Sequence, residues 1–299
     1  MASFFDEIGR NRLKSIALLA AFFLLFTAII FIFTLFLGLN IFGLVIAAVL
    51  VALYAMFAYF MGGQMVLKIS GAQKADPKKY HYLYDIVEGM ALASQVKTPD
   101  IYIINDPNPN AFATGRDRKH ASIAVTTGLL SMMDKRELQG VIAHEMSHVA
   151  DNDIKFMLIA VVFAGVIGLI AAMFRGLFWF GGLGSGRGRG GGIVILIALA
   201  IGLLAPLFAL LLRLAISRRR EYMADANGGR ITRDPQSLAG ALQKIKDYMS
   251  SPKAQPVARA NETTASLYFS SPLRASSIVN LFSTHPPIDE RIKRLKQMY

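Results

Sequence analysis

The amino-acid sequence predicts a mainly α-helical membrane protein, in which four transmembrane helices are attached to an α+β domain with a small β-hairpin or sheet. Hydrophobic residues make up 54% of the 299 residues, and the mean hydropathy is +0.44. The apolar residues are concentrated in uncharged runs of about 20 residues, the length that crosses a bilayer as a helix. The polar remainder contains short β-prone runs and amphipathic helical segments.

The four apolar runs lie at residues 16–36, 41–61, 156–174 and 193–212. One such run could be the buried core helix of a soluble protein, but the polar remainder is too small to cover four of them. The first run is too long for a cleaved signal peptide and lacks a small-residue cleavage site. We therefore expect a multi-pass protein that contacts the lipid bilayer through all four runs.

These spans divide the chain into four parts. Residues 1–63 form an N-terminal transmembrane hairpin, 64–155 the first part of the polar domain, 156–214 a second transmembrane hairpin, and 215–299 the second part of the polar domain. In the polar parts, residues 64–98 are expected to be helical and 101–104 to form a strand, and Pro286 and Pro287 are expected to start a helix.

The formal net charge of +12 comes largely from Lys and Arg beside the spans. No basic stripe interleaved with aromatic residues occurs in the polar parts, so no nucleic-acid partner is expected. The positive-inside rule places the N-terminus and both polar parts in the cytoplasm. The loop between the third and fourth spans departs from this pattern, since it carries Arg175, Arg187 and Arg189.

The helix predicted for residues 134–151 carries the sequence H-E-x-x-H. An Asp at its first position and a Glu three residues later predict a capping box. Residues four apart share a helix face, so His144 and His148 can bind one metal ion with Glu145 beside them, as in zinc peptidases. This pattern predicts a zincin-like domain; the alternative is two surface histidines. On an unbroken helix the third span, at Phe156, would begin ~12 Å from His148.

Zinc in a hydrolase needs a third protein ligand and one open position for water. Because the chain has no cysteine, this ligand must be a His or a carboxylate. Glu221 follows the fourth span and returns to the same membrane surface if spans three and four form a hairpin. Asp225 shares its helical face and can accept a hydrogen bond from a ligand imidazole. Alternatively, Glu221 pairs with Arg218 and Asp225 is a surface carboxylate.

Residues 110–115 and 122–126 are β-prone runs around a polar turn and predict a hairpin just before the H-E-x-x-H helix. An extended substrate can add to the edge of such a strand through main-chain hydrogen bonds. An ordinary hairpin that covers the core fits the pattern equally well. His120, in the turn, and His81 are expected to be solvated.

Four motifs carry a resemblance to a known family. They read N-A-F-A-T-G at 110–115, H-E-M-S-H at 144–148, E-Y-M-A-D at 221–225 and S-T-H-P-P at 283–287. Together with the number and order of the spans, they resemble the HtpX family of membrane zinc endopeptidases, relatives of the CAAX prenyl proteases. The resemblance covers nearly the whole chain.

The resemblance implies that His144, His148 and Glu221 bind one Zn2+ per chain and that Glu145 is the general base of a zinc metalloendopeptidase. It also implies that His285 stabilises the oxyanion, whereas the residues alone fit a loop histidine equally. The implied activity is cleavage of misfolded or damaged membrane proteins on the cytoplasmic side of a bacterial-type inner membrane, in quality control and stress response.

Within the first motif, Asn110, Ala111, Phe112 and Ala113 are the expected substrate-binding residues. Non-enzymatic alternatives are a catalytically silent zinc-binding scaffold and a transporter-like protein. A transporter should carry ionisable residues inside its spans, and the four apolar runs contain none. A silent scaffold should lack the general base, and Glu145 is present. The oligomeric state is not predicted.

Overall fold

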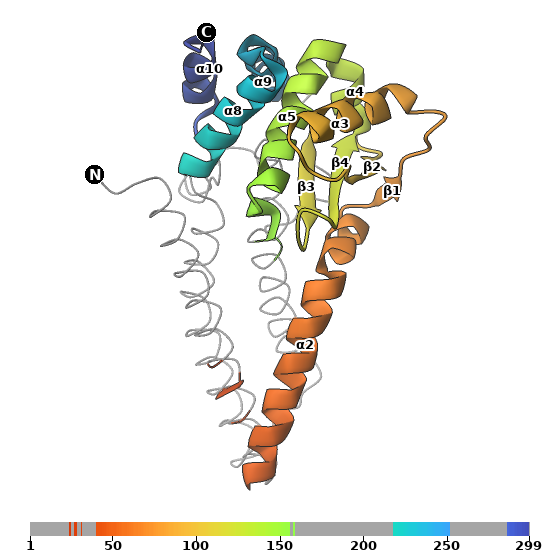
Figure 1. Ribbon diagram of the computed structural model, residues 1–299, viewed down its shortest axis with the longest axis vertical. Helices are drawn as coiled ribbons and strands as arrows, with labels where there is room; N and C mark the ends of the chain where they lie inside the picture. The colour runs from red at the N-terminus through yellow and green to blue at the C-terminus, as the bar shows by residue number, and fades with distance from the viewer. Residues whose placement is uncertain are drawn as a thin grey trace, which may run out of the picture. The chain divides into compact units, whose positions relative to one another are not determined.

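The structure is a computed structural model that describes residues 24, 27, 28, 31, 40–155, 158, 218–251 and 286–298 (Figure 1). Its contacts divide the chain into two compact units, residues 1–59 with 162–214 and residues 60–161 with 215–299. Most of both predicted transmembrane hairpins lies outside the described residues. The predicted four-part organisation therefore stays a prediction.

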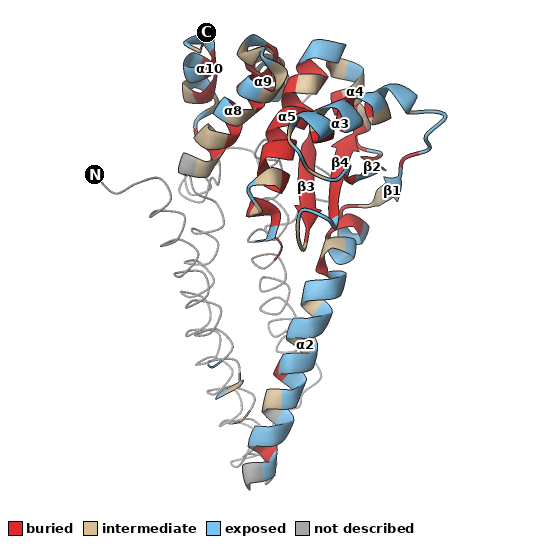
Figure 2. Cartoon of the chain, viewed as in Figure 1, coloured by how far each residue is buried: buried red, intermediate tan, exposed pale blue. Residues whose placement is uncertain are grey.

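Helix α2, Asn40–Ile69, is the one helix among the described residues that is long and apolar enough to cross a membrane, over Phe42–Ile69. Apolar side chains along it, such as Phe42 and Phe57, are exposed, as a lipid-facing helix requires. Figure 2 shows this exposure along its length. The other predicted spans, 16–36, 156–174 and 193–212, fall outside the described residues apart from five single helical positions.

The end of α2 differs from the prediction. The sequence placed the end of the second span at Met61, before Gly62 and Gly63, but the helix continues to Ile69. This last part of α2 lies against β3, since a side-chain carbon added at Gly63 would be 3.5 Å from the backbone of Gly115. Gly62 and Gly63 therefore do not end this helix.

A mixed four-stranded sheet lies in the second unit. Its strands are β1 Ala72–Lys74, β2 Asp100–Ile104, β3 Ala111–Gly115 and β4 Ala121–Thr126, in the order β1-β2-β4-β3. β2 is parallel to β4, and the other two pairs are antiparallel. The expected strand at 101–104 and the hairpin made by β3 and β4 are confirmed.

Strand β1 was missed, because residues 64–98 were expected to be one helical segment. The structure has the end of α2, then β1, then helix α3 at His81–Ala93. The three residues of β1 carry no apolar run that could have indicated a strand, and their pairing with β2 creates it. The confirmed part of the fold-class prediction is a helical chain with a small mixed sheet.

Five further helices complete the described chain. They are α4 Thr127–Met132, α5 Lys135–Ala150, α8 Arg218–Thr232, α9 Pro235–Met249 and α10 Ile288–Lys296. The predicted helix start after Pro287 is therefore confirmed. α5 lies at the centre of the unit, against the sheet on one side and α8 and α9 on the other, and Figure 2 shows it almost entirely buried.

Local chemistry fixes the start of α5. The side chain of Asp134 accepts the backbone N–H of Glu137, and Glu137 accepts that of Asp134, each at 2.9 Å. This is the expected capping box, which satisfies two backbone donors at the helix start. The apolar face formed by Leu138, Val141 and Ile142 is fully buried in the hydrophobic core. The histidine-bearing helix is thus held by its cap and by its packing.

Candidate metal centre

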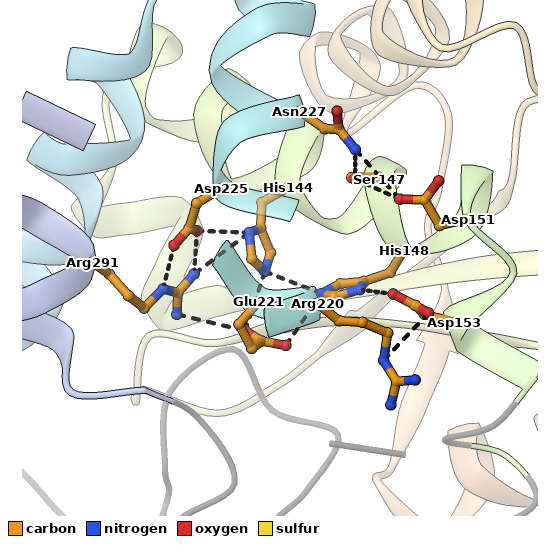
Figure 3. A network of polar contacts seen from close by, with 10 residues as sticks. All are labelled: His144, Ser147, His148, Asp151, Asp153, Arg220, Glu221, Asp225, Asn227 and Arg291. Atoms are coloured by element: carbon orange, nitrogen blue, oxygen red, sulfur yellow. Dashed lines mark hydrogen bonds and ion pairs between the residues drawn. The ribbon is translucent and has the colours of Figure 1, made fainter. Parts of the chain in front are cut away.

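His144 and His148 lie one turn apart on α5, and both side chains are buried (Figure 3). Their Nε2 atoms are 3.2 Å apart, and the two rings meet edge to face with centroids 4.8 Å apart. The four-residue spacing puts both rings on one helix face. Their Nε2 atoms therefore converge on one point.

Glu221 reaches this point from α8 and is 4% exposed. Its carboxylate oxygens lie 3.7 Å from Nε2 of His144 and 3.5 Å from Nε2 of His148. The structure thus brings Glu221 to two histidines that lie more than seventy positions earlier in the sequence. This burial is incompatible with a solvated Glu221 that pairs only with Arg218.

The separations of these atoms fit a metal ion. Ligand atoms bonded at ~2.0–2.1 Å in a tetrahedron lie about 3.3 Å from one another. The closest observed separations are 3.2, 3.5 and 3.7 Å, and the candidate ligand atoms all lie within 4.8 Å of one another. Among the described residues, the group of His144, His148 and Glu221 can therefore hold one metal ion.

Each imidazole is held on its other side by a carboxylate. Nδ1 of His144 lies 3.0 Å from Oδ1 of Asp225, and Nδ1 of His148 lies 3.2 Å from Oδ2 of Asp153. An ionised carboxylate can only accept, so each Nδ1 carries the proton and donates it. This tautomer leaves the lone pair of each Nε2 atom directed toward the metal position.

Asp153 was not predicted as part of the site. The condition of an unbroken helix, on which the ~12 Å spacing from His148 to Phe156 depended, is not met, because α5 ends at Ala150 and Asn152 adopts a left-handed backbone conformation with φ 58°. Asn tolerates this conformation better than most residues. The reversal returns Asp153 to His148. A short polar segment between a helix and an apolar run was the only signal in the sequence.

Arg291 was also missed, although it is 2% exposed and the largest fully buried side chain of the described residues. From α10 it donates two hydrogen bonds to Asp225, at 2.9 and 2.7 Å, and Nη1 lies 3.9 Å from Glu221. Burial would raise the pKa of Asp225, but the charge of Arg291 and the hydrogen bonds from His144 and Arg291 lower it to about 2. Asp225 is therefore ionised.

A second arginine pairs with the other carboxylate. Nε of Arg220, from the first turn of α8, lies 3.4 Å from Oδ1 of Asp153. Burial would lower the pKa of His148, but the hydrogen bond to Asp153 and the negative charges of Glu221, Asp153 and Glu145 raise it to about 9. Two parallel series of contacts therefore support the group, each running from arginine to aspartate to imidazole (Figure 3).

The two helices that supply the candidate ligands are closely packed. A side-chain carbon added at Gly228 of α8 would lie 3.2 Å from the backbone nitrogen of His144. Asn227 of α8 donates one hydrogen bond to Ser147, which lies one turn after His144 on α5, at 3.2 Å. It donates a second to Asp151, just after the end of α5, at 3.4 Å. These contacts fix α8 against α5 and hold Glu221 at the distance given above.

The remaining predicted site residues lie as follows. Glu145 is 4% exposed on α5, and His285 lies outside the described residues. β3, with Ala111–Ala113, is the last strand in the sheet order and packs against α5. Asn110 precedes it, and its N–H donates to Oγ1 of Thr126 at 2.8 Å. His81 and His120 are exposed, as expected.

Two imidazoles and a carboxylate on paired helices form the donor set with which metallopeptidases hold a catalytic metal. Together with the apolar helix α2 and the comparisons that follow, they define the chain as a membrane-associated metalloprotease. The chain belongs to peptidase family M48, whose sequence profile matches residues 77–299. The expected relationship to HtpX proteases is confirmed.

Relatives match over nearly their whole length. A protease HtpX homolog of Caldanaerobacter subterraneus subsp. tengcongensis is 44% identical over 294 residues, 97% of this chain and 96% of the relative. The homolog of Streptococcus thermophilus is 41% identical, covering 98% of this chain and 99% of the relative. The crystal structure of S. mikatae Ste24p shares the fold with a TM-score of 0.50 at 20% identity, covering 97% of this chain and 66% of that protein.

Proposed function

We propose that the protein is a zinc-dependent endopeptidase in which His144, His148 and Glu221 hold the metal ion. The observation that carries this proposal is the convergence of the three side chains on one buried point. Two imidazole nitrogens and a carboxylate oxygen, with no thiolate, are the ligand set of many catalytic zinc sites with an open fourth position. When bound, the zinc ion lowers the pKa of water and polarises the scissile carbonyl.

Glu145 is the general base. It is adjacent to His144 on α5, and its charge acts on both His148 and Arg291. Its carboxylate takes one proton from the water whose oxygen attacks the carbonyl carbon. It then gives that proton to the amine nitrogen as the peptide C–N bond breaks. The same residue thus acts first as base and then as acid.

Asp225 and Asp153 are positioning residues that act through the imidazoles. Each accepts the Nδ1 proton of one ligand and so fixes its tautomer and the direction of Nε2. Arg291 holds Asp225 through two hydrogen bonds, a geometry that lysine cannot reproduce. Arg220 supports Asp153 in the corresponding position. These four residues preorganise the metal site before substrate binds.

His285 is proposed to donate a hydrogen bond to the oxyanion of the tetrahedral intermediate. Two facts support this role. The resemblance to HtpX proteases includes the S-T-H-P-P motif, and His285 directly precedes the segment leading into α10. α10 carries Arg291 to the metal group, so the start of this helix belongs to the same part of the fold.

Asn110, Ala111, Phe112 and Ala113 are proposed to bind the substrate backbone. β3 ends the described sheet and packs against α5, so a strand added there would pass beside the H-E-x-x-H helix. All five residues of β3 are buried. Addition of a substrate strand therefore requires the outer edge of β3 to become accessible.

The proposed substrates are misfolded or damaged membrane proteins, cleaved on the cytoplasmic side of the cell inner membrane. The distribution of Lys and Arg beside four apolar runs supports this orientation and a multi-pass topology. The H-E-x-x-H helix is close in sequence to an apolar run, which supports substrates that emerge from the same bilayer. Quality control under stress is the corresponding cellular role.

The test is cleavage of unfolded casein by the full chain in detergent, with zinc, with a chelator and with the variant Glu145→Gln. We expect cleavage only by the zinc-loaded wild type, whereas Glu145→Gln should bind metal without turnover. Equal rates for Glu145→Gln and wild type would refute the role of Glu145. Chelator-resistant cleavage would refute the metal mechanism, and no cleavage by any form would favour a silent scaffold.

A further inference from the structure

The turn between β3 and β4, residues 116–120, presents positive charge to solvent. We name it the basic turn. Arg118 and Lys119 are exposed, and Arg116 is half-buried. The one acid, Asp117, is engaged within the turn, since its carboxylate accepts the backbone N–H groups of Lys119 at 2.8 Å and His120 at 2.9 Å. The same carboxylate lies 3.6 Å from Nε of Arg116, so the exposed cations that the turn offers to a partner are those of Arg118 and Lys119.

The basic turn is fixed against α2. Gly115 adopts φ +147°, and a side-chain carbon there would lie 2.3 Å from the carbonyl oxygen of His120, so the hairpin closes tightly. A carbon added at Gly63 of α2 would lie 3.5 Å from Cα of Gly115. The guanidinium carbon of Arg116 lies 5.1 Å from the centroid of the Phe60 ring, a cation–π contact. Figure 1 shows this end of the hairpin beside the last turns of α2.

Phe60 lies where the hydrocarbon region should end. A span that starts at Phe42 and needs about 20 residues to cross the hydrocarbon ends near Met61. Phe60 is exposed, as are Met56 and Phe57 on the preceding turn. Arg116 therefore covers an aromatic ring at the level where hydrocarbon gives way to headgroups. Lys68, exposed on α2, lies eight residues further along, ~12 Å above this level.

The other side of the basic turn faces the end of α5. Burial raises the pKa of Asp151, and the nearby positive charge of Arg118 opposes that rise. Asp151 follows the last residue of α5, and the apolar run predicted to form the third span begins at Phe156, directly after the exposed Lys155. The basic turn thus lies between two points at which the chain is expected to reach the membrane.

We propose that the basic turn, together with Lys68 and Lys155, binds the headgroups of anionic phospholipids in the bilayer that α2 crosses. The ligand chemistry is a phosphodiester at the membrane surface, which Arg118 suits through its planar donors. The exposed cations lie within reach of the negative surface potential of such a bilayer. Binding there holds the end of β3 that is nearest the membrane. Because β3 packs against α5, the whole strand is then kept at a fixed height above the lipid.

The first experiment measures contact between the basic turn and lipid. Because the chain has no cysteine, His120→Cys gives a single labelling site that keeps all the cations, and His81→Cys is a matched exposed control. Figure 1 shows the start of α3, where His81 lies, at the far end of the sheet from this turn. Each labelled chain is placed in nanodiscs containing headgroup spin-labelled lipid. We expect strong quenching at 120 and little at 81; equal or no quenching would overturn the proposal.

The second experiment measures headgroup preference. Quenching at position 120 is compared for spin-labelled phosphatidylglycerol and phosphatidylcholine. We expect stronger quenching by phosphatidylglycerol, and this preference should fall as the salt concentration rises. The double variant Arg118→Glu, Lys119→Glu should reduce the preference by tenfold or more, since each cation contributes about fivefold. Lys78→Glu with Lys79→Glu, an equal change of charge at exposed positions before α3, should leave it unchanged. The absence of any preference in the wild type would overturn the proposal.

The proteolytic function is kept separate from this test. All lipid measurements are repeated in the Glu145→Gln background, so their result does not depend on turnover. Casein cleavage by the Arg118→Glu, Lys119→Glu variant in detergent should match that of the wild type, because neither residue contacts the metal group. The two proposals can therefore fail independently.

Discussion

Nδ1 of His148 donates a hydrogen bond to Asp153 at 3.2 Å. On an unbroken helix, residues five positions apart would point in different directions and could not make this contact. The contact exists because α5 ends at Ala150 and the chain reverses at Asn152. The end of the helix is therefore part of the metal site.

Removal of Asp153 should weaken metal binding. Asp153→Ala leaves His148 free to rotate and to adopt the other tautomer, and loss of such a partner costs about 10–100-fold in metal affinity. Asp153→Asn keeps an oxygen that can accept the Nδ1 proton and should retain part of the affinity. Competition with a chromogenic chelator measures the change. Asp85→Ala, at an exposed position of α3, is the control. Wild-type affinity in Asp153→Ala would contradict the role.

Removal of Glu221 should release the metal. Two imidazoles alone leave the ion under-coordinated, so Glu221→Ala should purify with little bound metal. Metal analysis by mass spectrometry gives the stoichiometry, and Glu88→Ala, an exposed glutamate on α3, should keep one ion per chain. A full complement of metal in Glu221→Ala would show that another residue is the third ligand.

Truncation of Arg291 should destabilise the fold itself. Arg291→Met leaves the buried carboxylate of Asp225 without its charged partner, which costs about 3–5 kcal/mol. Arg291→Lys restores the charge but not both hydrogen bonds and should be intermediate. Thermal unfolding in detergent measures both, with Lys293→Met, exposed on the same helix, expected to change stability by less than about 1 kcal/mol. Equal melting temperatures for Arg291→Met and Lys293→Met would refute the prediction.

The stability of the metal-free protein should fall at alkaline pH. The pKa of His148 is raised from 6.5 to about 9, with burial opposing the rise and Asp153, Glu221 and Glu145 causing it. The folded chain thus binds this proton more tightly than the unfolded chain. Binding of this proton contributes on the order of 3 kcal/mol to the free energy of unfolding. The contribution is fully present below pH 6.5 and is lost as the pH rises through 9.

Metal binding should show the reverse dependence, because the ion must displace that proton and so binds more tightly as the pH rises. Melting temperatures of the metal-free and zinc-loaded proteins at pH 6 and pH 9 test both statements. The difference in melting temperature between the zinc-loaded and metal-free proteins should be larger at pH 9 than at pH 6. Asp153→Ala should reduce the fall in melting temperature that the metal-free protein shows between these two pH values. A metal-free protein that is more stable at pH 9 than at pH 6 would contradict the assignment of the proton to His148.

Substitution of His285 should lower turnover without releasing the metal. Loss of one oxyanion donor costs about 10²–10³-fold in kcat. We expect His285→Ala to keep its zinc and its KM for a peptide substrate, while kcat falls. His81→Ala is the matched control. An unchanged kcat would leave His285 as a loop residue.

The site was predictable where its chemistry follows from short-range spacing. His144, Glu145 and His148 share one helix, and the capping box that starts that helix is also local. The β3–β4 hairpin was predictable for the same reason, since two alternating runs flank one charged turn. β1 was not, because three residues without an apolar pattern become a strand only by pairing with β2.

Arg291 and Asp153 could not have been assigned from the sequence. Arg291 is one of several cations in a short, highly charged helix, and nothing in the local pattern distinguishes it from its exposed neighbours Lys293 and Arg294. Its burial depends on α10 packing against α8 and α9. Asp153 similarly reads as one acid in a polar segment until the reversal at Asn152 returns it to His148.

The donor types and the helix that carries two of them follow from the amino-acid pattern, because helical periodicity alone puts residues four apart on one face. The apolar helix α2 is likewise predictable from the sequence, because a long uncharged apolar run has the length of a membrane span. The carboxylates and arginines that surround the imidazoles, in contrast, are selected by the packing of the folded chain. Those groups come from separate helices, and the distances between them are set by packing, such as the close approach of Gly228 to His144, which no local pattern encodes.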